Sequence, residues 1–357
     1  MFTNMNILNQ LSKSTNNFDI LRLFGAFLVF FGHAILINGG VGIFRWSHGL
    51  TISAIGVNIF FIISGFLITK SWQESHNSTF FLIKRFLRIY PGLIVAGALT
   101  VFIVGPLTTF LSTTDYIKNG QIIHYSKDIL FLSLLDIRSN VLPGVFVTNK
   151  LPLIVNASLW TIPIEIMCYF FILISGFIGL LKRKRYFLYL SLIFVILDII
   201  LSTLIAKVDG LLAIDIIRLV TYFIIGMTMY LYREQIRISK ILIIVLFILF
   251  LISLGISKLS FIGYLTFPAI ILYIAMIKTS IFKKILSHGD FSYGFYLFAF
   301  PIQQSTYFFL NNKVAVIMQI TISFFITLIL AILSWNLVEK KFIDLKKYYQ
   351  NYCNKIV

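Results

Sequence analysis

The stretch FDILRLFGAFLVFFGHAILI (residues 18–37) is apolar enough to lie in a lipid bilayer, yet it carries Arg22 and His33. As an α-helix it has the length needed to span the hydrocarbon core of a membrane. The two residues are eleven positions apart, so they share one helix face about 16 Å apart along the axis. Because ionisable groups at that depth usually face a polar cavity, the pair predicts a functional site. The alternative is a packing histidine and an arginine that reaches the membrane surface.

The composition is that of a membrane protein. The 357 residues are 59% hydrophobic and only 12% charged, and their mean hydropathy is +0.94. Soluble domains carry about 25% charged residues, so a soluble fold is excluded. The net charge of +17 comes from short basic runs between apolar segments, a pattern typical of membrane orientation signals. We therefore expect membrane lipids as neighbours and no nucleic-acid partner.

Apolar segments of membrane-spanning length recur along the whole chain. Charged or turn-forming breaks divide them into about ten spans. The predicted fold is therefore all-α, a polytopic transmembrane helical bundle. The predicted spans are 19–38, 50–70, 89–111, 159–181, 186–206, 211–232, 240–257, 260–278, 290–311 and 314–338.

Basic runs predict the orientation of these spans. With a cytoplasmic N-terminus, the runs KRFLR, KRKR, REQIRISK and KKFIDLKKYY all fall inside, as the positive-inside rule requires. Both termini are then cytoplasmic, in an N-terminal segment (1–18) and a basic tail (343–357) that flank a membrane domain (19–342). One external loop, about 112–158, is expected to be either a lid or acceptor platform or a solvated connector.

Several common features are not expected in this chain. The polar N-terminus predicts no removable signal peptide, and no internal repeat or appended soluble domain is recognisable. Cys168 and Cys353 lie in different contexts, so we expect no mutual disulfide. The sequence shows no metal-binding spacing, phosphate loop or nucleophile elbow, so we expect no metal cofactor.

Ionisable residues near the predicted outer surface form one layer. His33, Glu165 and Arg218 all lie about 7 to 11 Å beneath that surface on the predicted spans. Charges at this depth need partners, so we expect either mutual pairing around a wet cavity or a purely structural ion-pair cluster. An imidazole suits a reactive role because its ordinary pKa of about 6.5 lets it accept and return a proton, and Glu165 is the candidate to orient it.

A second layer of charge lies near the predicted cytoplasmic surface. Arg22 enters the first span there, and Lys84, Arg85 and Arg88 precede the third. Planar guanidinium groups bind two phosphate oxygens at once, so this layer is a candidate site for an anionic ligand. Simple anchoring by the positive-inside rule is the alternative.

Six motifs in order give the chain a family resemblance. It resembles the acyltransferase 3 family of bacterial integral-membrane acyltransferases from about Phe18 to Phe342. The motifs are the Arg22 to His33 signature with Asp19 before it, FFIISGFLIT (60–69), RFLRIYP (85–91), SLWTIPIEIMCYF (158–170) with Trp160 and Glu165, SYGFYLFAFPIQ (292–303) with Tyr293, and Glu339 in SWNLVEKKF.

The resemblance implies transfer of an acyl group, commonly acetyl from cytoplasmic acetyl-CoA, to a hydroxyl of a surface glycan such as O-antigen, capsule or peptidoglycan. The location implied is the bacterial inner membrane. With this donor, the CoA phosphates are expected on Arg85, Arg88, Lys84 and Arg22. His33 is expected to act as general base or transient acyl carrier, with Arg218 or Tyr293 as candidates to stabilise the oxyanion.

The chain departs from the family pattern at one motif and in length. Ala299 stands where many members carry a second histidine, so no role of that histidine carries over. The family's soluble esterase-like extension is also absent, so either a separate partner enzyme is needed or the membrane domain acts alone. A transporter or flippase that uses the same intramembrane charges is the rival function.

Overall fold

The computed structural model describes residues 5–6, 16–40, 50–75, 77–133, 141–204, 212–256, 259–277, 289–310 and 315–346. These residues are almost entirely helical, and the sheet among them is a single antiparallel pairing of β1 (Met5–Asn6) with β2 (Arg237–Ile238). The predicted all-α class is confirmed.

Helices occupy all the segments that were predicted to span the membrane. The described helices of the first half are α2 (Phe18–Ile37), α3 (Ile52–Ser75), α4 (Ser78–Leu99) with the π-helix η2 (Thr100–Val104) and α5 (Gly105–Thr108), then α6 (Thr113–Lys118) and α7 (Gly120–Phe131) in the predicted loop, and α8 (Thr161–Phe177). In the second half they are η3 (Leu180–Lys182), α9 (Lys184–Leu204), α10 (Leu212–Leu231), α11 (Lys240–Gly255), α12 (Ile262–Met276), α14 (Ser292–Leu310), α15 (Val316–Ser334) and η5 (Trp335–Glu339).

Several of these helices are long and apolar enough to cross a membrane, which makes this a multi-pass membrane protein. Among the described residues, 6 helices meet both conditions, and α8, α11 and α12 are shorter apolar helices. The number of ten spans and the cytoplasmic position of both termini stay predictions.

The start of the third span was predicted wrongly. The helix begins at Ser78 rather than at residue 89, so the basic run KRFLR lies inside α4. Lysine and arginine are good helix formers, but a search for apolar residues leaves them out. Here the Lys84 ammonium stands 3.9 Å from the centroid of the Phe80 ring, one turn earlier on the same helix. The basic layer is therefore part of the helix and not a loop before it.

The chain divides into two compact units. Unit 1 comprises 1–25, 44–78 and 166–288, and unit 2 comprises 26–43, 79–165 and 289–357. The helices α2 and α8 are each divided between the two units. Arg22, Arg218 and the α9–α12 helices belong to unit 1, whereas His33, Glu165, the basic run of α4 and α14 belong to unit 2.

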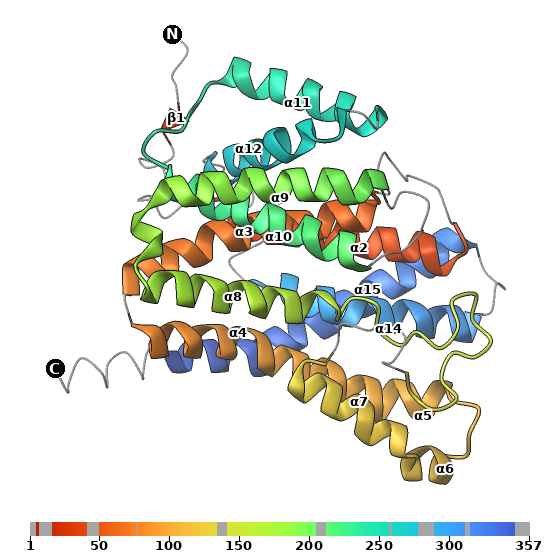
Figure 1. Cartoon of the computed structure of the whole chain (residues 1–357). Helices are drawn as coiled ribbons and strands as arrows, with labels where there is room; N and C mark the ends of the chain where they lie inside the picture. Colours follow the sequence, from red (N-terminus) through yellow and green to blue (C-terminus); the bar gives the residue numbers. More distant parts are fainter. Residues whose placement is uncertain are drawn as a thin grey trace. The chain divides into compact units, whose positions relative to one another are not determined.

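In unit 1, glycines let α3 and α10 pack closely. A Cβ atom at Gly65 would lie 2.0 Å from the carbonyl oxygen of Phe223, and one at Gly226 would lie 2.3 Å from that of Ile62. Small residues allow such close approach between membrane helices. Beside them α9 packs on α10, and α11 and α12 form an antiparallel hairpin (Figure 1).

In unit 2, an aromatic cluster joins α2, α14 and α15. The rings of Phe27, Phe30, Phe295 and Phe324 pack with centroids 5.0 to 5.7 Å apart. Aromatic rings prefer these edge-on and tilted arrangements, which bury much apolar area and hold the helices in register. The cluster fixes the half of α2 that carries His33 against α14.

The segment predicted to be an external loop contains the two short helices α6 and α7, which pack against α4 and η2. The Tyr116 hydroxyl donates to the carbonyl oxygen of Val101 in η2 at 2.9 Å. Burial raises the pKa of Tyr116 to about 12, so this phenol stays a protonated donor at neutral pH. Tyr125 and Ile129 of α7 are also buried. This part of the loop is a packed element and not a merely solvated connector.

Candidate functional site

His33 presents a ring nitrogen that the described part of the protein leaves unsatisfied. The imidazole meets the Phe300 ring of α14 edge-on, with centroids 5.1 Å apart. Its Nδ1 atom is buried and has no hydrogen-bond partner among the described residues, although the residue as a whole is only half-buried. A buried polar atom without a partner is costly. A hydrogen bond to a bound molecule or to water would satisfy this nitrogen.

His33 of α2 and the SLW segment before α8 both contact α14, on neighbouring turns of that helix. Tyr296 lies one turn before Phe300, and its hydroxyl donates to the carbonyl oxygen of Ser158 at 2.6 Å while lying 2.7 Å from the Thr161 hydroxyl. Glu165, one turn further along α8, is close enough to interact electrostatically with Tyr296. His33, the predicted base, and Glu165, the carboxylate predicted to orient it, thus both lie near α14, on neighbouring turns.

The segment between α7 and α8 is tied to α14 by side-chain amides. Asn156 donates to the carbonyl oxygen of Leu297 at 2.9 Å, and Asn149 donates to the Gln304 side-chain oxygen at 2.8 Å. Gln303 donates to the carbonyl oxygen of Phe30 on α2 at 2.8 Å. Between these anchors Ala299, the departure from the family histidine, is buried. The half-buried Trp160 directly precedes α8.

A second polar cluster joins three of the quoted motifs in unit 2. Arg88 of RFLRIYP forms an ion pair with Asp290 at 2.6 Å, and Asp290 also accepts from the Ser292 hydroxyl at 2.5 Å. The Arg88 guanidinium lies 5.7 Å from the Tyr293 ring centroid and 5.9 Å from that of Trp335. We call Arg88, Asp290, Tyr293 and Glu339 the Arg88 cluster.

Glu339 is the buried acid of this cluster. It is 1% exposed, and the Ser334 hydroxyl donates to its Oε1 atom at 2.8 Å. The Tyr293 hydroxyl donates to the carbonyl oxygen of Ile89 at 3.0 Å. A Cβ atom at Gly92 would lie 2.9 Å from the Tyr293 ring and 3.2 Å from the Glu339 carboxyl carbon, so glycine makes room for both. The first turns of α14, α4 around Gly92 and η5 are therefore held together by polar contacts.

The remaining basic candidates are also positioned by neighbours. Arg22 pairs with Asp19 at 3.1 Å, one turn earlier on α2. Because α2 is continuous from Phe18 to Ile37, Arg22 and His33 share one helix as predicted. Arg85 lies over the Phe81 ring at 5.8 Å.

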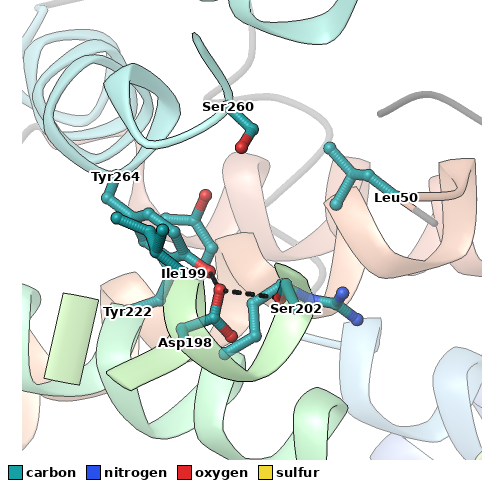
Figure 2. A pocket seen from close by; sticks show the side chains of 8 residues that line it. Leu50, Asp198, Ile199, Ser202, Tyr222, Ser260 and Tyr264 are labelled. Atoms are coloured by element: carbon teal, nitrogen blue, oxygen red, sulfur yellow. Dashed lines mark hydrogen bonds between the residues drawn. The ribbon is translucent and has the colours of Figure 1, made fainter. Parts of the chain in front are cut away.

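Arg218 lines a small polar cavity in unit 1. It bonds with Asp215 on its own helix. The cavity of about 50 Å³ is lined by Leu50, Asp198, Ile199, Ser202, Arg218, Tyr222, Ser260 and Tyr264. Figure 2 shows Asp198 between Tyr264 and Ser202, both of which donate to its carboxylate. Since His33 and Glu165 belong to unit 2, the grouping of all three around one cavity stays a prediction.

Sequence reasoning missed several acids and a tyrosine of these clusters. Asp198 interrupts the apolar helix α9, so its position inside a span could have singled it out. Asp290 and Tyr296 gave weaker signals: one lies two residues before a quoted motif and the other inside it. Asp215 is the remaining one, in the first turn of α10.

Comparison with known proteins finds similarity to acyltransferases. A family model described as "Acyltransferase domain" matches residues 15–336. The O-acetyl transferase of Shigella phage Sf6 is 30% identical over 338 residues, covering 92% of this chain and 96% of that protein. Nodulation protein 10 of Rhizobium leguminosarum bv. viciae is 46% identical over 91 residues, covering 24% of this chain and 23% of that protein. No solved structure matches the chain.

The family match covers nearly the whole described chain, and the phage relative aligns end to end. Together they confirm the resemblance drawn from the motifs and the prediction of an enzyme of the O-acetyltransferase type. The chain belongs to the acyltransferase 3 family.

Proposed function

We propose that this protein moves an acetyl group from cytoplasmic acetyl-CoA to a hydroxyl of a cell-surface polysaccharide, either an O-antigen or a capsule sugar. The proposed location is the bacterial inner membrane, with both termini in the cytoplasm. The family match and the name of the phage relative support O-acetyl transfer. The observation that carries the proposal is the buried Nδ1 atom of His33, which has no hydrogen-bond partner among the described residues.

In the proposed reaction His33 is the general base. Its neutral imidazole takes the proton of the acceptor hydroxyl, whose oxygen attacks the thioester carbonyl carbon. The carbon–sulfur bond then breaks, and the imidazolium returns the proton to the departing thiolate. If His33 instead carries the acetyl group transiently, a bond from the imidazole nitrogen to the acetyl carbon replaces the carbon–sulfur bond, and the thiolate leaves with the imidazole proton. The acceptor oxygen then attacks the acetyl-imidazole, the nitrogen–carbon bond breaks, and the hydroxyl proton returns to the imidazole. Both routes need a group that stabilises the oxyanion, for which Arg218 and Tyr293 stay the candidates.

Glu165 is proposed to orient the imidazole or to stabilise its cation. Its support is indirect: it interacts with Tyr296, one turn of α14 from the Phe300 ring on which His33 packs. A carboxylate that holds an imidazole in one orientation is a common partner of a histidine base.

The donor phosphates are proposed to bind the basic residues near the cytoplasmic surface. Lys84, Arg85 and Arg22 supply the positive charge, and phosphate favours such donors. Arg88 already holds Asp290, but a guanidinium has five N–H donors and can hold a carboxylate and a phosphate together. In this role the Arg88 cluster fixes the direction of the arginine.

The test is release of free thiol from acetyl-CoA by the purified protein in the presence of surface polysaccharide. The native protein is expected to release thiol. In His33→Gln the rate of thiol release is expected to fall at least 100-fold, because loss of a general base lowers a rate about 10² to 10⁴-fold. His124→Gln is the matched control, because His124 is exposed on α7. If acetyl-CoA is not consumed while cells expressing the protein export a glycolipid, the transporter reading replaces the proposal.

A further inference from the structure

A large apolar groove lies in unit 1, whereas His33 and Glu165 belong to unit 2. It has a volume of about 710 Å³ and runs between α9, α10, α11 and α12. Representative lining residues are Leu192, Ile225, Leu246, Leu265 and Ala269. We call it the α9–α12 groove. Its volume is within the range of about 300 to 1,000 Å³ that is typical of ligand pockets.

The groove is long as well as wide. Its lining extends from Leu188 to Val195 on α9 and from Phe261 to Ala269 on α12, about 10 to 12 Å along each helix. One leaflet of a bilayer core is about 15 Å deep. The groove therefore suits an extended hydrocarbon chain in polarity and covers most of the depth of one leaflet, whereas water would find few polar partners there.

One end of the groove is strongly basic. Arg237 is the charged residue of its described lining, and it is exposed. Gln235, also in the lining, accepts a hydrogen bond from the Lys184 ammonium at 2.5 Å once its amide is oriented to suit its neighbours. Lys240 begins α11 three residues after Arg237. Arg233, four residues before Arg237, pairs with Glu234 at 3.9 Å, so the positive charge at this end comes mainly from Arg237, Lys184 and Lys240. The positive-inside pattern predicts that this end faces the cytoplasm.

We propose that the α9–α12 groove binds one anionic phospholipid, with an acyl chain along the apolar lining and the phosphate at Arg237. Arg237 supplies charge where the groove opens, and Lys184 and Lys240 add to the field around it. Basic pockets between membrane helices on the cytoplasmic side suit anionic headgroups for this reason. A zwitterionic lipid would place its acyl chain in the same groove but gain less binding free energy from Arg237. This site is independent of the proposed acetyl transfer.

The experiment measures thermal unfolding of the purified full-length protein in detergent, titrated with dioleoyl-phosphatidylglycerol or with dioleoyl-phosphatidylcholine. The two lipids share their acyl chains and differ in headgroup charge. A ligand that binds only the folded state stabilises it by an amount that grows with the logarithm of the ligand concentration divided by Kd, so at equal concentrations the tighter-binding lipid raises the midpoint more. We expect a clear rise with phosphatidylglycerol and a much smaller one with phosphatidylcholine.

Two variants separate the headgroup from the chain. Arg237→Gln should weaken phosphatidylglycerol binding about fivefold, the usual effect of one basic residue near a membrane surface. Ala269→Phe places a ring in the path of the acyl chain and should reduce the rise. The matched controls are Arg183→Gln, an exposed basic residue outside the described lining, and Ala213→Phe, an exposed alanine of α10.

Each result bears on the proposal. Equal shifts with both lipids, or equal losses in Arg237→Gln and Arg183→Gln, would overturn it, because the groove would then lack headgroup selectivity at Arg237. Since Arg237 is exposed, its substitution tests the headgroup even if Ala269→Phe fails to fold. Native mass spectrometry of the wild-type protein should show one retained anionic lipid, and retention of zwitterionic lipid alone would also overturn the proposal.

Discussion

Breaking the ion pair between Arg88 and Asp290 should destabilise unit 2 more than breaking an exposed pair. The side chains of Arg88 and Asp290 are 24% and 14% exposed, and their atoms are 2.6 Å apart. Removing one partner of a fully buried pair costs about 3 to 5 kcal/mol, whereas exposed pairs contribute about 0 to 1 kcal/mol. For this partly exposed pair we expect Asp290→Asn to lower the free energy of unfolding by about 2 kcal/mol, midway between these cases. Asparagine keeps an acceptor for the Ser292 hydroxyl, so the loss reports mainly on the charge.

The assay is equilibrium unfolding of the purified protein by denaturant in detergent, followed by tryptophan fluorescence. The matched control is Glu74→Gln, which breaks the pair between Lys70 and Glu74 at 3.7 Å, where Glu74 is 64% exposed. That control should cost less than about 0.5 kcal/mol. A double-mutant cycle of Arg88→Gln with Asp290→Asn isolates the pair from other contacts. If the two substitutions are additive, or if Asp290→Asn costs no more than Glu74→Gln, the Arg88 cluster does not hold α4 to α14.

Two further substitutions test packing, one in each unit. Gly65→Ala places a Cβ atom 2.0 Å from the Phe223 carbonyl oxygen, so it should lower the free energy of unfolding by at least about 1 to 3 kcal/mol, the cost of an overpacked core. The control Gly255→Ala meets no atom within 4 Å and should change stability little. Equal yields of folded protein from both variants would contradict the packing of α3 on α10. Tyr116→Phe removes a buried hydrogen bond and should lower the free energy of unfolding by about 1 kcal/mol, whereas the exposed Tyr189→Phe should not, a difference that thermal unfolding in detergent measures.

Fold class and helix positions followed from the sequence because a membrane imposes a simple rule. Every spanning segment must hydrogen-bond its own backbone groups and present apolar side chains to lipid, so an apolar stretch of sufficient length predicts a helix. The same rule failed at α4, because Lys84, Arg85 and Arg88 place charged groups on a helix and Lys84 and Arg85 lie over aromatic rings one turn earlier. Hydropathy does not register such contacts.

The candidate site was predictable in its residues but not in its contacts. Arg22, His33 and Glu165 were found because ionisable groups inside apolar helices are costly. The partners could not be read from the sequence: Asp290 meets Arg88 from more than 200 residues away, and Tyr296 reaches Ser158 across a long loop. These pairings depend on how α14 packs, which local patterns do not encode.

The most direct test of the central claim is mass spectrometry of surface polysaccharide from cells that express the native chain, His33→Gln or His124→Gln at equal membrane levels. We predict an acetyl ester, removable by mild base, with the native chain and with His124→Gln, and none with His33→Gln. The same acetyl content in all three strains would contradict an acetyl transfer that depends on His33.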